Sequence, residues 1–200
     1  MALIEMNLDF ILEIDKETFI YLNSLGSSTF DNFWLLISDK KSSIPLYIFL
    51  IYFLKKNLNS KHFISSIIFI GLLILFTDQI SGFFKDYYER LRPCHDQLII
   101  SKIRIVKESC GGLYSFFSSH ASNSFALASF FYFLMSKKNR YIKLLFVWAL
   151  IVSYSRIYIG VHFPLDIICG TFFGLFSGYL FSWVLNKKYN VIPVSYTHLR

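Results

Sequence analysis

Long stretches without formal charge recur along the chain and predict helices that cross a membrane. A helix needs about 20 residues to span the hydrocarbon core of a bilayer. Three stretches meet this length with at most one formal charge each, at 63–84, 116–136 and 163–185. A fourth, 141–158, carries Lys143 and Arg156 near its two ends, where long side chains reach the interface. These four stretches are predicted spans.

A fifth apolar stretch, at 44–54, is too short to span a bilayer alone. It crosses only if its helix begins earlier, around 33–38, and places three charged residues near the interface, namely Asp39, Lys40 and Lys41. With this stretch included, the hydrophobic pattern predicts an all-α, polytopic bundle of about five transmembrane helices.

The N-terminal segment has the pattern of an amphipathic helix. Polar residues recur at helical spacing on one side, at Asp9, Glu13, Lys16 and Glu17, and apolar residues lie on the other, at Leu8, Ile11, Leu12, Phe19 and Leu22. Such a helix either lies along the membrane surface or packs as a soluble helix on the end of the bundle, and the pattern does not separate the two. The acidic residues also argue against a cleavable signal peptide.

Composition places the whole chain in the membrane class. Of its 200 residues, 54% are hydrophobic and 16% are charged, and the mean hydropathy is +0.49. These values are too apolar for an ordinary soluble domain or a disordered chain. Because no repeat or Gly/Ser linker divides the sequence, we expect one integral-membrane domain over 1–190 and a disordered or non-native tail over 191–200.

The net charge of +7 becomes informative once the charges are placed on the predicted topology. Three short basic loops, at 55–61, 137–140 and 187–188, fall on one side and mark it as cytoplasmic. The opposite, external side receives the long segment 85–115 and the short turn at 160–163. That side also carries many cations, namely Lys85, Arg90, Arg92, Lys102, Arg104, Lys107 and Arg156. Because this excess defies the positive-inside trend, it indicates an anionic substrate rather than nucleic acid.

Two of the three cysteines, Cys94 and Cys110, lie in the predicted external segment. An oxidising compartment permits a disulfide between them, but spacing alone does not fix the geometry that a disulfide requires. A bridge and two free thiols therefore both remain open. Cys169 lies inside the last predicted span, where we expect it to serve packing.

Two clusters of polar residues lie at the boundaries of the predicted spans. The first, Lys85, Arg92 and Pro93, ends the span at 63–84, where basic residues also occur simply as interfacial anchors. The second opens the span at 116–136 and consists of Ser118, Ser119 and His120. Hydroxyl groups and free backbone N–H groups at a helix N-terminus can cradle an anion.

The third cluster has the clearest chemical meaning. Arg156, His162 and Asp166 lie within eleven residues at a membrane boundary, where charged groups are costly unless they are paired or used. Pro164 suits the first turn of a helix, which puts His162 just before that helix and Asp166 about one turn along. A carboxylate there can accept the Nδ1–H of the imidazole and leave Nε2 as the basic nitrogen. This is the arrangement of an activated histidine nucleophile.

The three clusters together resemble the type 2 phosphatidic acid phosphatase (PAP2) superfamily, whose members include bacterial membrane lipid phosphate phosphatases related to vanadium haloperoxidases. The matching patterns are Lys-x6-Arg-Pro at 85–93, Ser-x-His at 118–120 and Ser-Arg-x3-Gly-x-His-x3-Asp at 155–166. The family's middle motif is Pro-Ser-Gly-His, and Phe117 and Ser119 replace its proline and glycine here. The resemblance implies a helical PAP2/haloperoxidase-like core.

The resemblance also implies a role for each matching residue. His162 attacks phosphorus and forms a phosphohistidine, Asp166 orients it, and His120 protonates the leaving alkoxide and later activates water. The phosphoryl oxygens are bound by the remaining residues, namely Lys85, Arg92, Ser118, Ser119 and Arg156. No cofactor or metal is expected, because fixed cations can stabilise the transferring phosphoryl group.

These observations lead to one principal functional prediction and two alternatives. We expect a metal-independent enzyme of the inner membrane that dephosphorylates a lipid phosphate or diphosphate at its external face. A lipid phosphotransferase of the same chemistry and a non-catalytic phospholipid transporter remain alternatives. Substrates implied by the resemblance are undecaprenyl diphosphate, phosphatidylglycerol phosphate, phosphatidic acid and lipid A phosphates. Asp78 is seven residues before Lys85 on the same predicted helix face, and we expect it to have a partner inside the bundle.

Overall fold

The structure, a computed structural model, describes residues 2–107 and 109–191, with the backbone alone for residues 2–8. In these residues the chain forms seven α-helices, four short 3₁₀ helices and one isolated bridge between Leu91 and Tyr114. The predicted all-α class is therefore confirmed. The tail 192–200, within the predicted non-native segment, lies outside the described residues, and Val191 just before it packs on the core.

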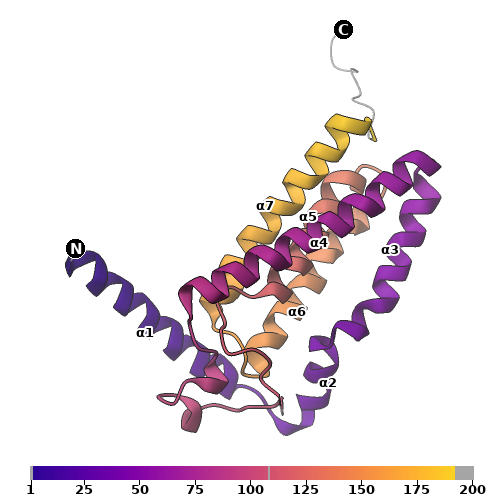
Figure 1. The fold of residues 1–200 in the computed structure, drawn as a ribbon. Helices are drawn as coiled ribbons and strands as arrows, with labels where there is room; N and C mark the ends of the chain where they lie inside the picture. The colour runs from indigo at the N-terminus through magenta and orange to yellow at the C-terminus, as the bar shows by residue number, and fades with distance from the viewer. Residues whose placement is uncertain (1, 108, 192–200) are drawn as a thin grey trace.

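Four long helices run side by side and form the bundle (Figure 1): α4 (Ser60–Tyr88), α5 (Ser119–Met135), α6 (Leu144–Tyr158) and α7 (Pro164–Tyr189). Helix α5 lies at the centre, in contact with α4, α6 and α7. Within the described residues, three helical stretches are long and apolar enough to cross a membrane, at Ser60–Tyr88, Arg140–Tyr158 and Pro164–Tyr189. Helix α5 covers most of the predicted span at 116–136.

The contact between α5 and α7 depends on a line of glycines. Gly170, Gly174 and Gly178 follow one another at four-residue intervals and face the backbone of α5. An added Cβ at Gly170 would lie 2.7 Å from the carbonyl oxygen of Ser118. Small residues at this spacing let two membrane helices approach closely. The glycines therefore set the distance between α5 and α7 along this contact.

The predicted continuous helix from 33–38 through 54 is wrong. The chain forms α2 (Ser28–Ser38), a 3₁₀ turn η1 (Lys40–Ser43) and α3 (Ile44–Asn57) instead. The Asp39 side chain accepts a hydrogen bond from the Lys41 backbone N–H at 3.0 Å and caps the turn. Pro45 then lies in the first turn of α3, a position that proline tolerates, whereas inside a continuous helix it would remove a hydrogen bond and clash with the preceding turn.

Helix α1 (Ala2–Ser24) packs its C-terminal half on the end of the bundle and runs at a steep angle to it (Figure 1). Phe19 and Asn23 are fully buried there. The Asn23 side chain donates hydrogen bonds to backbone carbonyls of Ile157 and Tyr158 and accepts one from the Arg104 backbone N–H at 2.7 Å. This confirms the packed alternative for that half of the helix, while Phe10, Ile11 and Ile14 remain exposed.

The long segment between α4 and α5 covers the same end of the bundle as α1 and α2 (Figure 1). It contains η2 (Pro93–His95) and η3 (Ile100–Lys102), and a disulfide joins Cys94 to Cys110, whose Cα atoms are 6.4 Å apart. The structure thus contains the bridge that the sequence left open. The three predicted basic loops lie at the opposite end, where α3 meets α4, α5 meets η4 (Arg140–Lys143), and α7 ends.

Candidate active site

His162 and Asp166 lie together at the start of α7, and both are buried. The Nδ1 atom of His162 is 3.3 Å from Oδ2 of Asp166. Pro164 begins α7, and Asp166 accepts the backbone N–H of Phe163 at 3.0 Å, as a carboxylate at a helix N-terminus commonly does. The local rules of helix initiation therefore place this carboxylate next to the histidine.

Gly160 forms the turn between the end of α6 and His162. Its φ is +85°, a left-handed conformation that side chains disfavour, and an added Cβ would lie 2.9 Å from the carbonyl oxygen of Arg104. The glycine in the sequence motif is thus required both by its backbone conformation and by the close approach of the external segment.

Burial and the charges of three cations favour the neutral form of His162. Burial lowers the pKa of His162 well below its ordinary value of 6.5, and the charges of Arg156, Arg92 and Lys85 lower it further. A hydrogen bond with the Ser115 backbone acts in the opposite direction. A neutral imidazole keeps a lone pair on its free nitrogen, which a nucleophile requires.

The side chain of Lys85 reaches from the last turns of α4 to the start of α5. Its Nζ donates to the hydroxyl of Ser119 at 2.6 Å and approaches the hydroxyl of Ser81 at 3.4 Å. The hydroxyls of Ser81 and Ser119 also contact each other. The structure therefore brings Lys85 and Ser119 together at the N-terminus of α5, as the sequence predicts, and adds Ser81 to them.

Ser118 is fully buried and serves as the N-cap of α5. Its hydroxyl accepts the backbone N–H of Ala121 at 3.4 Å, and its own backbone N–H donates to the Asp166 carbonyl oxygen at 3.1 Å. In this structure Ser118 thus holds the two helix starts together. The predicted contact with a phosphoryl oxygen stays a prediction.

Arg92 and Arg156 approach the site from two different elements. Arg92 donates through Nε to the carbonyl oxygen of Tyr114 at 3.1 Å and through Nη1 to that of Cys110 at 2.8 Å, which anchors the external segment. Arg156, at the end of α6, donates through Nη1 to the hydroxyl of Ser38. Its buried Nε has no hydrogen-bond partner in the described part of the chain, so this donor is available to an anion.

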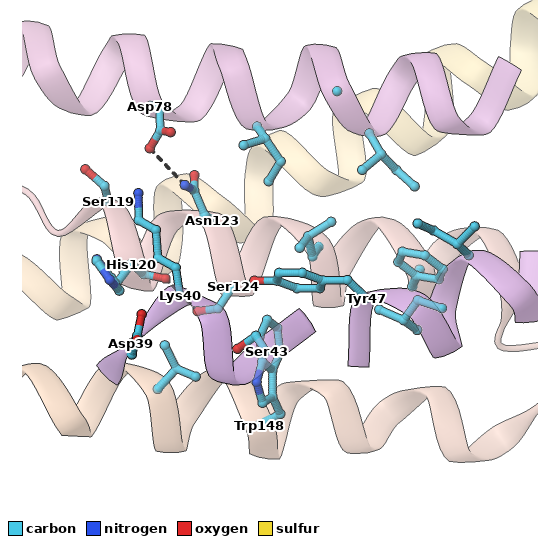
Figure 2. Close-up of a pocket in the computed structure, with 18 of the residues that line it drawn as sticks. Asp39, Lys40, Ser43, Tyr47, Asp78, Ser119, His120, Asn123, Ser124 and Trp148 are labelled. Carbon is cyan, nitrogen blue, oxygen red and sulfur yellow. Dashed lines mark hydrogen bonds between the residues drawn. The ribbon is translucent and has the colours of Figure 1, made fainter. Parts of the chain in front are cut away.

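His120 lines two adjoining cavities, and Figure 2 shows it beside Ser119 and Lys40. One cavity, of about 480 Å³, is a polar mouth bounded by Asp39, Lys40, Lys107 and His120. The other, of about 470 Å³, is a largely apolar groove between α3, α4, α5 and α6. The predicted acid–base residue therefore stands where a polar entrance meets an apolar groove.

Asp78 faces this groove from α4 and has the partner that the sequence predicts. Its Oδ1 accepts the side-chain amide of Asn123 at 2.8 Å (Figure 2). The Asn123 amide oxygen is in turn 2.5 Å from the hydroxyl of Thr77. The expectation of a partner within the bundle is confirmed.

Several residues at the site were not singled out by the sequence. Arg90 donates to Oδ1 of Asp166 at 2.9 Å, and Asp15 of α1 pairs with Arg90. Ser38 is the last residue of α2, and Lys40 begins η1. Arg90 lies inside the Lys-x6-Arg-Pro run and among the external cations, but neither signal predicts its pairing with Asp166. Asp15 and Ser38 are remote in sequence, and no local pattern distinguishes them.

Comparisons with known proteins agree with the fold and the motifs. A family model described as PAP2 superfamily matches residues 63–190. A Bacteroides thetaiotaomicron protein named lipid A 4'-phosphatase is 34% identical over 183 residues, which cover 90% of this chain and 80% of that protein. A Porphyromonas gingivalis protein of the same name is 37% identical over 180 residues, which cover 86% of this chain and 73% of that protein.

Two solved structures share the architecture. The crystal structure of Aquifex aeolicus LpxE aligns with a TM-score of 0.62 and 24% identity, covering 82% of this chain and 92% of that one. A transmembrane PAP2 type phosphatidylglycerolphosphate phosphatase from Bacillus subtilis aligns with a TM-score of 0.66 and 19% identity, covering 90% and 87% of the two chains. At these identities the likeness concerns the fold.

Proposed function

This chain belongs to the PAP2 superfamily, and from that premise we propose that it releases phosphate from its substrate through a phosphohistidine on His162. It is a phosphatase that acts on membrane lipid phosphates. The observation that carries the proposal is the buried pair of His162 and Asp166, with Nδ1 of the imidazole held 3.3 Å from a carboxylate oxygen. Such a pair fixes the tautomer and leaves Nε2 to attack.

In the proposed first step, the Nε2 lone pair of His162 forms a bond to phosphorus while the bond from phosphorus to the lipid oxygen breaks. The departing alkoxide takes a proton from His120. In the second step His120 accepts a proton from water, the water oxygen bonds to phosphorus, and the bond between phosphorus and nitrogen breaks. Inorganic phosphate leaves, and both histidines return to their starting forms.

The cations supply the electrostatic stabilisation that phosphoryl transfer requires. Lys85, Arg92 and Arg156 all act on His162 electrostatically, and this supports the proposal that they bind the oxygens of a phosphoryl group on its Nε2. The Nε donor of Arg156, which has no partner among the described residues, supports a direct contact with a phosphoryl oxygen. The backbone N–H groups at the start of α5, around Ser119, are proposed to complete the cradle.

We further propose that the substrate is a glycolipid that carries a phosphate on its sugar headgroup, as the names of both relatives indicate for those proteins. A headgroup of that size needs an open, polar entrance, and the mouth beside His120 provides one with Lys40 and Lys107 at its edge. Polyprenyl and glycerol phosphates have smaller headgroups and are expected to be poorer substrates.

The apolar groove is proposed to hold an acyl chain of the bound lipid. It begins at Ser119 and His120 and continues along Ile67, Ile70 and Ile74 of α4. Exposed Gly71 and Ile51 also line it, so the groove opens on the flank of the bundle. We propose that a bound lipid reaches His162 with its phosphate from the His120 end of the groove while its chain stays level with the bilayer.

The site is proposed to face the exterior of the inner membrane. The basic loops lie at the opposite end of the bundle (Figure 1), and such loops stay in the cytoplasm. Leu98→Cys in the external segment, where Leu98 is exposed, and Lys137→Cys at the other end of the bundle report the orientation, each in a Cys169→Ser background. A membrane-impermeant maleimide added to spheroplasts should label the first, and labelling of Lys137→Cys instead would contradict this orientation.

The activity is tested on purified protein in detergent with a chelator present. We expect more phosphate release from a lipid A-type sugar phosphate than from a polyprenyl diphosphate or phosphatidic acid, and none from His162→Ala. His62→Ala is the matched control, because His62 lies in the first turn of α4 at the far end of the bundle. Turnover by His162→Ala would overturn the nucleophile, and transfer of the label to a second lipid would favour a phosphotransferase.

A further inference from the structure

The side chain of Arg90 joins two carboxylates that come from opposite ends of the sequence. Its Nη1 donates to Oδ1 of Asp166 at 2.9 Å, and its Nη2 donates to Oδ2 of Asp15 at 2.5 Å. Asp166 is fully buried, and Asp15 and Arg90 are largely buried. The guanidinium therefore links α1 directly to the carboxylate beside His162.

Asp15 makes a second contact with the helix that carries Asp166. Its Oδ1 accepts the backbone N–H of Leu165 at 2.8 Å, one of the amides in the first turn of α7 that lack partners within the helix. One carboxylate of α1 thus binds both the arginine and the start of α7.

Aromatic packing holds the arginine between these two carboxylates. The guanidinium carbon of Arg90 lies 4.1 Å from the centre of the Phe163 ring, a distance suited to a cation–π contact. The Phe163 ring packs edge-on against Phe19 of α1, with the ring centres 5.2 Å apart. Arg90 is therefore restrained by contacts on its face as well as at its two nitrogens.

We infer that Asp15 and Arg90 are positioning residues that orient the Asp166 carboxylate toward His162. This inference rests on the proposed role of His162 as nucleophile. The family match begins at residue 63, so Asp15 lies outside it, and α1 becomes part of the support of the active site.

The geometry explains why both carboxylates are needed. An arginine that has a single carboxylate partner tends to bind both carboxylate oxygens, through two parallel N–H···O hydrogen bonds. Here Asp15 binds Nη2 of Arg90, so only Nη1 of Arg90 binds Asp166, at Oδ1. The other oxygen of Asp166, Oδ2, stays with His162 and the Phe163 amide. Without Asp15, Arg90 is free to turn onto both oxygens of Asp166 and draw Oδ2 away from the imidazole.

Asp15→Asn tests the inference, because it keeps the volume and the acceptor for Leu165 while it removes the charge that holds Arg90. We expect kcat to fall about 10- to 100-fold, as for other losses of a group that orients a reacting residue, with KM within about twofold of wild type. Asp15→Glu keeps the negative charge, so its kcat should lie between that of Asp15→Asn and that of the wild type.

Lys16→Met is the matched control. Lys16 is the next residue of α1, and its Nζ forms an ion pair with Asp96 of the external segment at 3.0 Å. The substitution loosens α1 without touching Arg90 or Asp166, so we expect a kcat within about twofold of wild type. A comparable fall in kcat for Lys16→Met and Asp15→Asn would assign the effect to general loosening of α1 and overturn the inference.

The remaining outcomes also decide the question. An unchanged kcat in Asp15→Asn contradicts the positioning role, and so does a higher KM with unchanged kcat, which would indicate a role in substrate binding. If Asp15→Asn and Asp15→Glu both fail to give a single size-exclusion peak while Lys16→Met gives one, the pair serves stability and the inference fails. A wild-type enzyme that forms no phosphohistidine contradicts the proposed function instead, while the comparison of kcat with KM still decides the role of Asp15.

Discussion

The backbone N–H of Ser118, at the start of α5, donates to the carbonyl oxygen of Asp166, in the first turn of α7, at 3.1 Å. This bond fixes the segment that carries His120 relative to the segment that carries His162. The distance between the two helices therefore sets the distance between the two proposed catalytic groups.

Gly174→Ala is expected to disturb that distance. An added Cβ would overlap the carbonyl oxygen of Ser122 and lie 3.0 Å from the backbone nitrogen of Ala126, so α7 must move away from α5. Overpacking of this kind costs about 1–3 kcal/mol, and we expect a lower melting temperature and a lower kcat. Gly82→Ala on α4 is the control, because its added Cβ meets no atom of the described residues within 4 Å. Equal melting temperatures and equal kcat values for the two variants would contradict a close α5–α7 contact set by these glycines.

Asp166→Asn is expected to lower kcat about 10²- to 10⁴-fold, because the amide no longer selects the Nδ1–H tautomer of His162. The variant also removes the charge that pairs with Arg90. The proposed substrate-binding cations are unchanged in this variant, so KM should change little. Steady-state kinetics on a soluble phosphate monoester measure both constants, and a kcat near that of wild type would exclude Asp166 as the orienting group.

The pH dependence of kcat/KM is expected to reflect the lowered pKa of His162. Burial lowers it below 6.5, and Arg156 of α6, Arg92 of the external segment and Lys85 of α4 act in the same direction. His120 of α5 and Asp166 of α7 also face this group. Because the imidazole must be neutral to attack, activity should persist below pH 6.5 and be lost only as the pH falls through the lowered pKa.

This profile is measured from about pH 4 to 9 and corrected for the substrate phosphate, whose second pKa is about 6. A loss of activity centred at or above pH 6.5 after that correction would contradict the neutral nucleophile.

Gly71→Phe is expected to block the apolar groove selectively. Gly71 lines the groove, and an added Cβ there meets nothing within 4 Å, so the ring can enter without moving the backbone. We expect kcat/KM to fall about tenfold or more for a long-chain lipid phosphate, because buried methylene groups lose their site. A short-chain soluble phosphate should be affected by no more than about twofold.

Ile68→Phe is the control for this test, since Ile68 is exposed on the same helix, outside the groove. Equal losses for long-chain and short-chain substrates in Gly71→Phe would show that the groove does not hold the chain.

The sequence predicts the parts of the fold that depend on local rules. The pairing of His162 with Asp166 follows from Pro164 at a helix start, and the partner of Asp78 follows from the cost of a lone carboxylate in a membrane. The break at Asp39–Ser43 also has local causes, in the Asp39 cap and Pro45, but the hydrophobic pattern concealed it.

The contacts that the sequence could not predict are formed by tertiary packing. Asp15 lies 151 residues before Asp166, and only the docking of α1 on the bundle brings it to Arg90. Ser38 reaches Arg156 because α2 packs against α6. Ser118 is expected at a helix start from the sequence, but its backbone hydrogen bond to Asp166 depends on the packing of α5 against α7.

In the proposed mechanism, phosphate passes through a covalent bond to His162. The most direct measurement quenches the enzyme in alkali, which preserves phosphohistidine, after reaction with a ³²P-labelled aryl phosphate. The aryl leaving group needs no proton, so His120→Asn should still form the intermediate but hydrolyse it slowly. We predict label on His162 in the wild type, more label in His120→Asn and none in His162→Ala. If the wild type releases phosphate but neither the wild type nor His120→Asn carries label on His162, the covalent intermediate is contradicted.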